Sequence, residues 1–193
     1  MEGRSVAAYK AASDYFLNAV ELVTEMAWSR PGLGEWSVLE LVGHASRAYT
    51  TVEQYLLFPV APEPPGSSYF SPESIARRGR EAVEALGNDP RAAARDCARR
   101  AIELVDSLPA DATLGSPTRT VTLGEYLPSR TAELTIHTLD LLRACELEVS
   151  PPPAALEESL VFVAQMSLRK GSGKNVLLAL SGREALPTGF SVY

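Results

Sequence analysis

The sequence is poor in cysteine, histidine and aromatic residues, and it contains no long apolar run. Its 193 residues include two cysteines and two histidines, and 7% of them are aromatic. Cys97 and Cys145 can form one bridge at most and belong to no Cys-x-x-Cys pair, so we expect a reduced, cytoplasmic setting. No apolar run approaches the ~20 residues of a membrane-spanning helix, and residues 1–10 are too polar for a signal sequence. We therefore expect neither export nor membrane association.

Positive charge is also in deficit. The net charge is −6, whereas a nucleic-acid surface needs a basic stripe, so a nucleic-acid partner is not expected. Arg77, Arg78 and Arg80 form a local cluster, but Glu81 and Glu84 offset it. We interpret this segment as a solvated helix face, with anion binding as the alternative. Apolar residues make up 46% of the chain, enough for one domain over residues 1–193 with its own core.

Apolar residues recur at helical spacing almost throughout, and no stretch alternates for long with the period of two typical of a strand. A first helix is predicted over Ser5 to Met26, with Tyr9 and Phe16 towards the core. Pro31, Gly32 and Gly34 then break it. The pattern predicts an all-α protein.

Capping signals predict where the other helices begin. Ser37 with Glu40 and Thr122 with Glu125 are capping boxes, the first opening a helix that continues to about Phe58. Pro128 lies in the second turn of the helix after Thr122, where it can bend the helix without ending it. Further starts are predicted where an N-cap residue precedes proline, at Ser71–Pro72, Asp89–Pro90 and Ser150–Pro151, and a short apolar helix from Lys174 should end at Gly182. With a proline-rich crossover loop over residues 59–71, these elements favour a four-helix bundle with additional short helices.

The two histidines both lie inside predicted helices. His44 borders the apolar stripe of its helix, while Glu133 and His137 are four residues apart and therefore share a face. Two imidazoles and a carboxylate suit zinc, nickel or cobalt, and three protein ligands leave one position open for water or substrate. Glu40 also lies four residues before His44, although we assign it to the capping box. The spacing alone fits two hydrogen-bonded core histidines equally well.

Two of these segments resemble a known family. The stretch from Gly34 to His44, with its Trp-Ser helix start, and the stretch Glu133-Leu-Thr-Ile-His137-Thr-Leu-Asp140-Leu141 are similar to the DinB-like superfamily. In particular they resemble the N-terminal domain of mycothiol-dependent maleylpyruvate isomerase, an actinobacterial family whose ending the segment 177–190 also resembles. The resemblance implies a DinB-like bundle with His44, Glu133 and His137 as metal ligands. It covers the bundle of relatives that carry a second, sterol-carrier-like domain, so the isomerase substrate does not follow from it.

The resemblance also implies a chemistry. A divalent metal, zinc or nickel, would bind the thiol of mycothiol as a thiolate, which attacks a small electrophile and ends in conjugation or isomerisation. Asp140 is a candidate acceptor behind a ligand imidazole, and Arg47 is a candidate contact for a carboxylate of thiol or substrate, each with a surface role as the alternative. Cys97 and Cys145 are expected to be small buried side chains and not nucleophiles.

Three functions remain open from the sequence. The leading hypothesis is a metal-dependent thiol transferase or isomerase that uses mycothiol as cosubstrate. The second is a metal hydrolase that activates water at the same site. The third is a non-enzymatic bundle that binds a small ligand or forms a homodimer.

Overall fold

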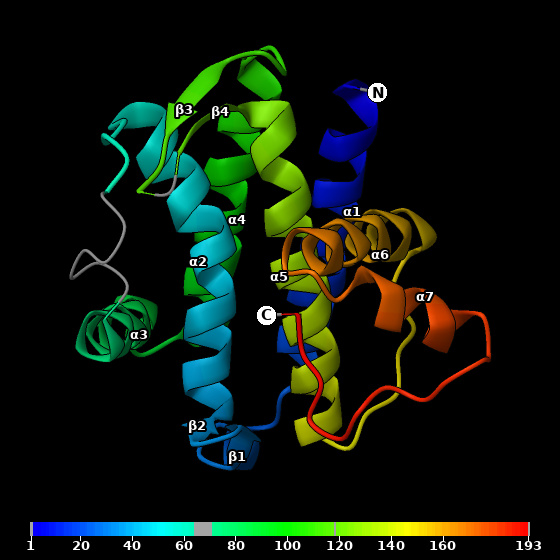
Figure 1. Cartoon of the computed structure of the whole chain (residues 1–193). Helices are drawn as coiled ribbons and strands as arrows, with labels where there is room; N and C mark the ends of the chain where they lie inside the picture. The colour runs from blue at the N-terminus through cyan, green and yellow to red at the C-terminus, as the bar shows by residue number, and fades with distance from the viewer. Residues whose placement is uncertain (1, 64–70, 118, 193) are drawn as a thin grey trace.

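The computed structural model describes residues 2–63, 71–117 and 119–192, and helices dominate them (Figure 1). Four long helices form a bundle: α1 (Glu2–Leu22), α2 (Val38–Leu57), α4 (Pro90–Ser107) and α5 (Leu123–Ala144). Both α5 and α4 pack against α1 and against α2, so the four helices enclose one core. The expected all-α four-helix bundle with additional short helices is confirmed.

Three aromatic rings fill the core between α1 and α2. Tyr9, Phe16 and Tyr49 are at most 1% exposed, and the ring of Tyr49 lies 6.2 Å from that of Tyr9 and 6.1 Å from that of Phe16, between centroids. The buried hydroxyl groups have partners: Tyr9 donates to the carbonyl of Ala48 at 3.2 Å, and Tyr49 shares a hydrogen bond of 3.0 Å with Ser13. An unpaired buried hydroxyl costs ~1–3 kcal/mol, so these bonds fix how α1 and α2 pack.

The two helices that carry the candidate ligands begin at the predicted capping boxes. The Ser37 hydroxyl accepts from the amide of Glu40 at 3.3 Å, and the Glu40 carboxylate accepts from the amide of Ser37 at 2.7 Å. Thr122 and Glu125 repeat the arrangement at 3.3 and 2.9 Å. Pro128 lies within α5, as expected. Both starts are therefore confirmed, and the position of each ligand along its helix is fixed from that start.

Two short hairpins lead into these helices, and the sequence pattern did not predict them. β1 (Pro31–Leu33) pairs with β2 (Trp36–Ser37), and β3 (Thr113–Gly115) pairs with β4 (Thr120–Thr122), both antiparallel. Strands of two or three residues are too short to show a period of two. Gly34 turns the first hairpin with φ of 59°, a conformation that glycine adopts without strain. Each hairpin ends on the residue that caps the following helix.

The first helix ends earlier than the predicted Met26. α1 stops at Leu22, and a 3-10 turn, η1 (Glu25–Ala27), follows it. Thr24 between them is extended, with ψ of 158°. β-Branched residues such as Thr24 and its neighbour Val23 favour extended backbone, and this local preference shortens the helix.

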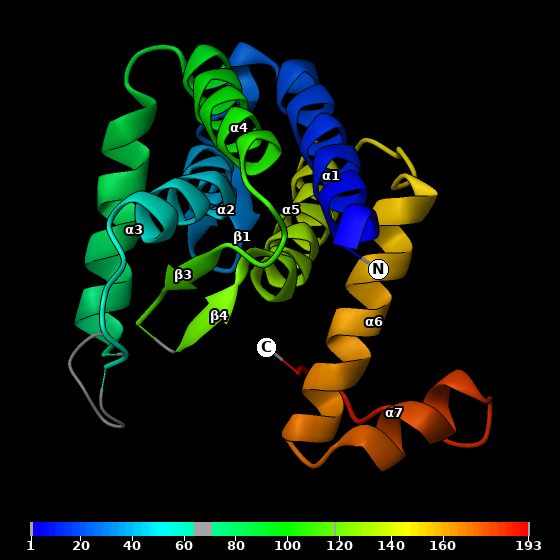
Figure 2. The same ribbon diagram turned by 90° about the horizontal axis from the view of Figure 1, so that it is seen from above.

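The remaining helices lie outside the bundle (Figure 2). α3 (Pro72–Leu86) packs on α2 and α4, α6 (Pro153–Arg169) crosses α1 and α5, and α7 (Gly173–Leu180) extends from α6. The predicted caps of α3 and α4 are confirmed, because the Ser71 and Asp89 side chains accept amide hydrogen bonds there. Residues 64–70 of the predicted crossover loop lie outside the described residues. Among the helices that the structure describes, none is long and apolar enough to cross a bilayer.

The predicted start of the sixth helix at Ser150–Pro151 is wrong. α6 begins at Pro153, and Pro152 is its N-cap residue, without a side-chain cap. A residue that precedes proline is driven away from helical backbone, and Pro151 and Pro152 each precede another proline. The first proline free of this restriction, Pro153, therefore starts the helix. The short terminal helix is confirmed as α7, and Gly182 follows it with φ of 72°.

Candidate metal centre

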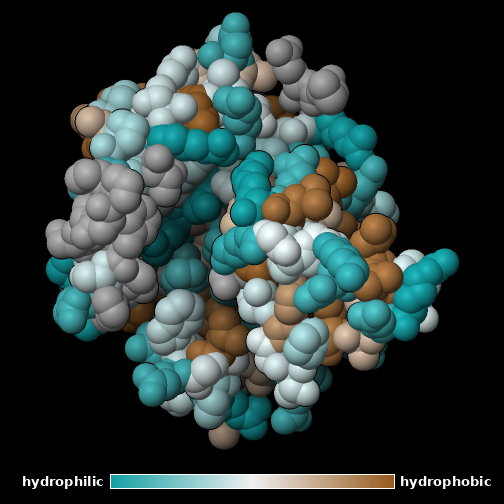
Figure 3. All heavy atoms as spheres, viewed as in Figure 1, coloured by the Kyte–Doolittle hydropathy of each residue, from teal (hydrophilic) through white to brown (hydrophobic). Residues whose placement is uncertain are grey.

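The two histidines and Glu133 meet between α2 and α5. These helices run antiparallel, so that His44 on α2 lies beside Glu133 on α5, and further along the same pair of helices Tyr55 lies beside Tyr126. His137 follows Glu133 by one turn and faces the same way. The space-filling view, from the same side as Figure 1, shows a hollow near the middle of the molecule with hydrophilic residues in its depth (Figure 3).

The donor atoms of the three side chains converge on one point. The Oε2 atom of Glu133 is 3.3 Å from Nε2 of His137 and 3.9 Å from Nε2 of His44. One donor atom of each residue lies within 4.8 Å of the other two. In a tetrahedral zinc site with bonds of ~2.0–2.1 Å, donor atoms are separated by roughly 3.4 Å. The three donors are thus close to the spacing of a zinc site, and the nitrogen and oxygen donor set suits this ion.

Two further side chains hold the imidazoles in place. Nδ1 of His137 lies 3.2 Å from Oδ2 of Asp140, one turn further along α5. The indole ring of Trp36 packs on His44, with 4.5 Å between ring centroids and 37° between the planes. The two imidazoles themselves meet edge to face at 4.9 Å. The sequence predicted the position of Asp140 but not the contact of Trp36, which was identified only as part of a motif.

The surroundings drive the two histidines to opposite charge states. Burial lowers the pKa of His44 to about 4, and the neighbouring His137 adds to this effect. Burial also opposes a charge on His137, but its hydrogen bonds to Asp140 and Glu133 dominate and raise its pKa to about 9. For Glu133, burial is outweighed by the bond to His137 and the charge of Arg130, so its pKa lies below the ordinary value. Near neutral pH the metal-free centre therefore pairs a neutral His44 with a His137–Glu133 ion pair.

The other candidates from the sequence lie outside the triad. Arg47 lies one turn after His44 and lines cavities of about 210 and 290 Å³ beside α3. Glu40 is engaged in the capping box, which agrees with that assignment and not with a ligand role. Cys97 and Cys145 are free thiols that are half-buried against the core. They are less buried than expected, because each lies at the edge of the core.

Sequence reasoning missed Arg130. This residue lies one turn before Glu133, and its guanidinium Cζ lies 5.0 Å from the centroid of the Tyr126 ring. Its spacing from Glu133 and Tyr126 on one helix was the signal that could have identified it.

The chain has a DinB-like helical fold in which two histidines and one glutamate meet between two of the long helices. A family profile described as the mycothiol maleylpyruvate isomerase N-terminal domain matches residues 9–142. The chain belongs to this family.

Two solved structures share the fold. One is a crystal structure of the mycothiol-dependent maleylpyruvate isomerase, with a TM-score of 0.60 and 14% identity, and the other is of a histidine-to-alanine mutant of such an enzyme, with a TM-score of 0.58 and 14% identity. In each case the similarity covers 86% of this chain and 70% of the other. No curated protein matches the sequence.

Proposed function

We propose that this protein is a metal-dependent enzyme in which a small thiol, mycothiol, adds to a small electrophile, with His44, Glu133 and His137 as the metal ligands. The convergence of these three donor atoms between α2 and α5 carries the proposal. Membership of the mycothiol maleylpyruvate isomerase N-terminal domain family supports the choice of thiol and of an isomerase or transferase reaction. Zinc fits the donor set best, and nickel is the alternative.

Neither cysteine of the chain is a convincing nucleophile. Burial raises the pKa of the Cys145 thiol, which disfavours the reactive thiolate. Cys97 lies on α4, whereas the triad lies between α2 and α5. A divalent ion held by the triad would supply the Lewis acidity that favours the thiolate form of an added thiol at neutral pH. The thiolate forms a carbon–sulfur bond at an activated double bond, and either protonation of the adduct or its elimination after rotation completes the reaction.

Each residue of the centre has a distinct part. Glu133 contributes the negative charge, and the imidazoles contribute neutral Nε2 donors once His137 has lost its proton. If Nε2 of His137 held the ion, the imidazole proton would lie on Nδ1, from which His137 would donate to Asp140. Asp140 thus fixes the tautomer and orientation of the ring. Trp36 covers one side of His44 and limits the rotation of that imidazole.

Elemental analysis and a thiol-dependent assay test the proposal. Purified protein should hold close to one equivalent of zinc or nickel per chain, and the loaded protein should speed addition of mycothiol to a maleyl-type electrophile near pH 7. The His137→Ala variant should lose both metal and turnover while it keeps its helix content, and Cys97→Ser should retain both. A chain that cannot be loaded with metal, or turnover that proceeds equally without thiol, would contradict the proposal; the latter result would indicate a hydrolase.

A further inference from the structure

Two arginines flank the metal centre on the same side. Arg47 lies three residues after His44 on α2, and Arg130 lies three residues before Glu133 on α5. Because α2 and α5 are antiparallel, both arginines are displaced from the triad in the same direction, by about 4.5 Å along the helix axes.

The guanidinium of Arg130 is held in a defined position. It lies over the ring of Tyr126 at 5.0 Å from the centroid, and its Nε donates to the hydroxyl of Ser129 at 3.1 Å. Tyr126 in turn packs against Tyr55 of α2, with 6.0 Å between ring centroids and 64° between the planes. Cation–π stacking orients a guanidinium without neutralising its charge, so the head group keeps N–H donors for another partner.

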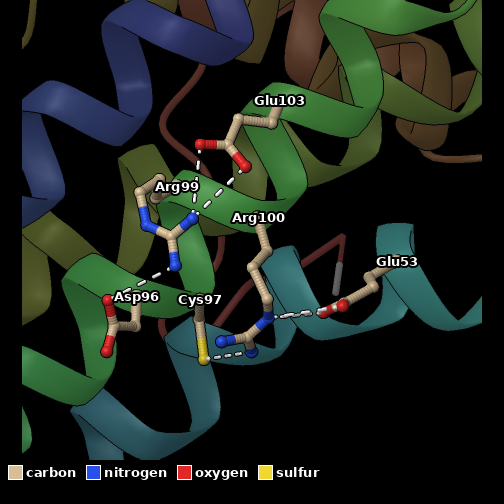
Figure 4. Close-up of polar contacts among 6 residues, drawn as sticks. All are labelled: Glu53, Asp96, Cys97, Arg99, Arg100 and Glu103. Atoms are coloured by element: carbon tan, nitrogen blue, oxygen red, sulfur yellow. Dashed lines mark hydrogen bonds and ion pairs between the residues drawn. The ribbon is translucent and has the colours of Figure 1, made fainter.

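Neither arginine forms a close ion pair, although the charge of Arg130 helps to lower the pKa of Glu133 one turn away. Within residues 2–63, 71–117 and 119–192, no carboxylate oxygen lies within 4.0 Å of the guanidinium of Arg47 or Arg130, although both side chains are half-buried. Several surface arginines form such pairs: Arg77 pairs with Glu81, and Arg99 pairs with Asp96 and Glu103 (Figure 4). Without such a close ion pair, a guanidinium keeps N–H donors for an added carboxylate, whose geometry its planar fork matches.

There is room for a ligand beside Arg47. Arg47 and Tyr55 line a cavity of about 290 Å³ between α2 and α3, which is also lined by Arg77, Arg78, Glu63 and Glu81. The ring of Tyr55 contacts the ring of Tyr126, over which the guanidinium of Arg130 lies. Tyr55 and Tyr126 thus connect the surroundings of the two arginines.

We propose that Arg130 binds a carboxylate group of the electrophilic substrate beside the metal centre, with Arg47 on the neighbouring helix as the second positive charge. This inference rests on the proposed function and assigns to it a residue that selects anionic electrophiles and positions them. Arg130 is a positioning and specificity residue, because it holds the part of the substrate that does not react.

Binding of maleate to the metal-free protein, measured by titration calorimetry, tests the inference without reference to turnover. Maleate carries two carboxylates, and dimethyl maleate has the same carbon skeleton without charge. Loss of a charge-assisted hydrogen bond corresponds to a roughly 10- to 100-fold change in affinity. Arg130→Gln should weaken maleate binding by about this factor, and the parent should bind dimethyl maleate no better than this variant binds maleate.

Two matched variants separate charge from fold. Arg130→Lys keeps the charge but loses the planar fork, so its affinity should lie between those of the parent and Arg130→Gln; it carries the test if Arg130→Gln fails to fold. Arg99→Gln removes an exposed arginine on α4 that forms ion pairs, and it should bind maleate as the parent does. Equal maleate affinity in the parent and the Arg130 variants would overturn the inference, as would parental binding of dimethyl maleate as tight as that of maleate.

A kinetic measurement on metal-loaded protein distinguishes positioning from stability. Arg130→Gln should raise KM for an anionic electrophile while metal content and helix content stay at the parental level. An unchanged KM would overturn the inference. If the parent binds maleate but shows no thiol-dependent turnover, the proposed function fails while the anion site stands.

Discussion

The indole ring of Trp36 and the imidazole ring of His44 lie 4.5 Å apart between centroids, with 37° between their planes. Trp36 belongs to the short strand β2 that immediately precedes α2, so the hairpin places an aromatic ring against the candidate ligand His44, two turns into the helix. The ring shields one face of His44, whose burial is the main cause of its low pKa.

We predict that Trp36→Ala weakens metal binding by about 10-fold, because residues that orient a ligand influence affinity by roughly 10- to 100-fold. Trp36→Phe keeps an aromatic wall and should lose less. Competition with a chromogenic zinc chelator measures both affinities. If Trp36→Ala binds zinc as tightly as the parent, the ring does not orient His44.

Metal binding should release a proton. His137, with a pKa of about 9, carries a proton at pH 7 in the metal-free protein, whereas His44, with a pKa of about 4, does not. A metal needs both Nε2 atoms unprotonated, so about one proton leaves as it binds, and the apparent affinity should rise as the pH increases from 6 to 9. Calorimetric titration in two buffers of different ionisation enthalpy counts the protons. A binding enthalpy that is identical in the two buffers would contradict the assignment.

Asp140 should act on the metal through His137. In Asp140→Asn the side chain loses its charge, so the pKa of His137 should fall and metal affinity should decrease by roughly 10- to 100-fold. NMR titration of the His137 ring follows the pKa, and chelator competition follows the affinity. Arg143→Gln is the control, since Arg143 lies 3.9 Å from Asp140 but its side chain is 82% exposed. A loss in the control as large as that in Asp140→Asn would assign the effect to general surface charge.

The capping box of α2 predicts a pH-dependent contribution to stability. Hydrogen bonds from Ser37 lower the pKa of Glu40, so its contribution is present above the unfolded-state pKa of about 4.5 and is lost as the pH falls through the lower folded-state pKa. We expect Glu40→Gln to decrease the free energy of unfolding by ~0.5 kcal/mol at pH 7 and to have little effect near pH 3. Urea unfolding at the two pH values measures this difference. An equal loss at both would show that the carboxylate charge is irrelevant to the cap.

The features that the sequence predicted correctly are those that depend on residues close together in the chain. Ser37 with Glu40 and Thr122 with Glu125 form local hydrogen bonds, and so their spacing was enough to locate the starts of α2 and α5. The i, i+4 spacing likewise placed Glu133 and His137 on one face. The family resemblance, and not the spacing, linked these two residues to His44.

What escaped prediction depends on contacts between segments that are distant in the chain. The position of Arg130 depends on Tyr126, whose ring packs against Tyr55 of another helix. No local sequence pattern predicts this contact. The hairpins before α2 and α5 pair only two or three residues per strand. Strands this short do not show the alternation of apolar and polar residues by which a strand is predicted. The run of three prolines misled the prediction of α6 because each proline restricts the residue before it.

The three donor atoms come from two helices that are separated in the chain by α3, α4 and the second hairpin. No stretch of the chain shorter than residues 44–137 contains all three residues, so the site exists only when α2 and α5 have packed together. A bound ion would act as a cross-link between distant parts of the chain, and by mass action it would stabilise the folded state by an amount that rises with the logarithm of its free concentration above Kd. The midpoint temperature of thermal unfolding therefore reports how much of the protein has metal bound, and this measurement does not require the substrate to be known.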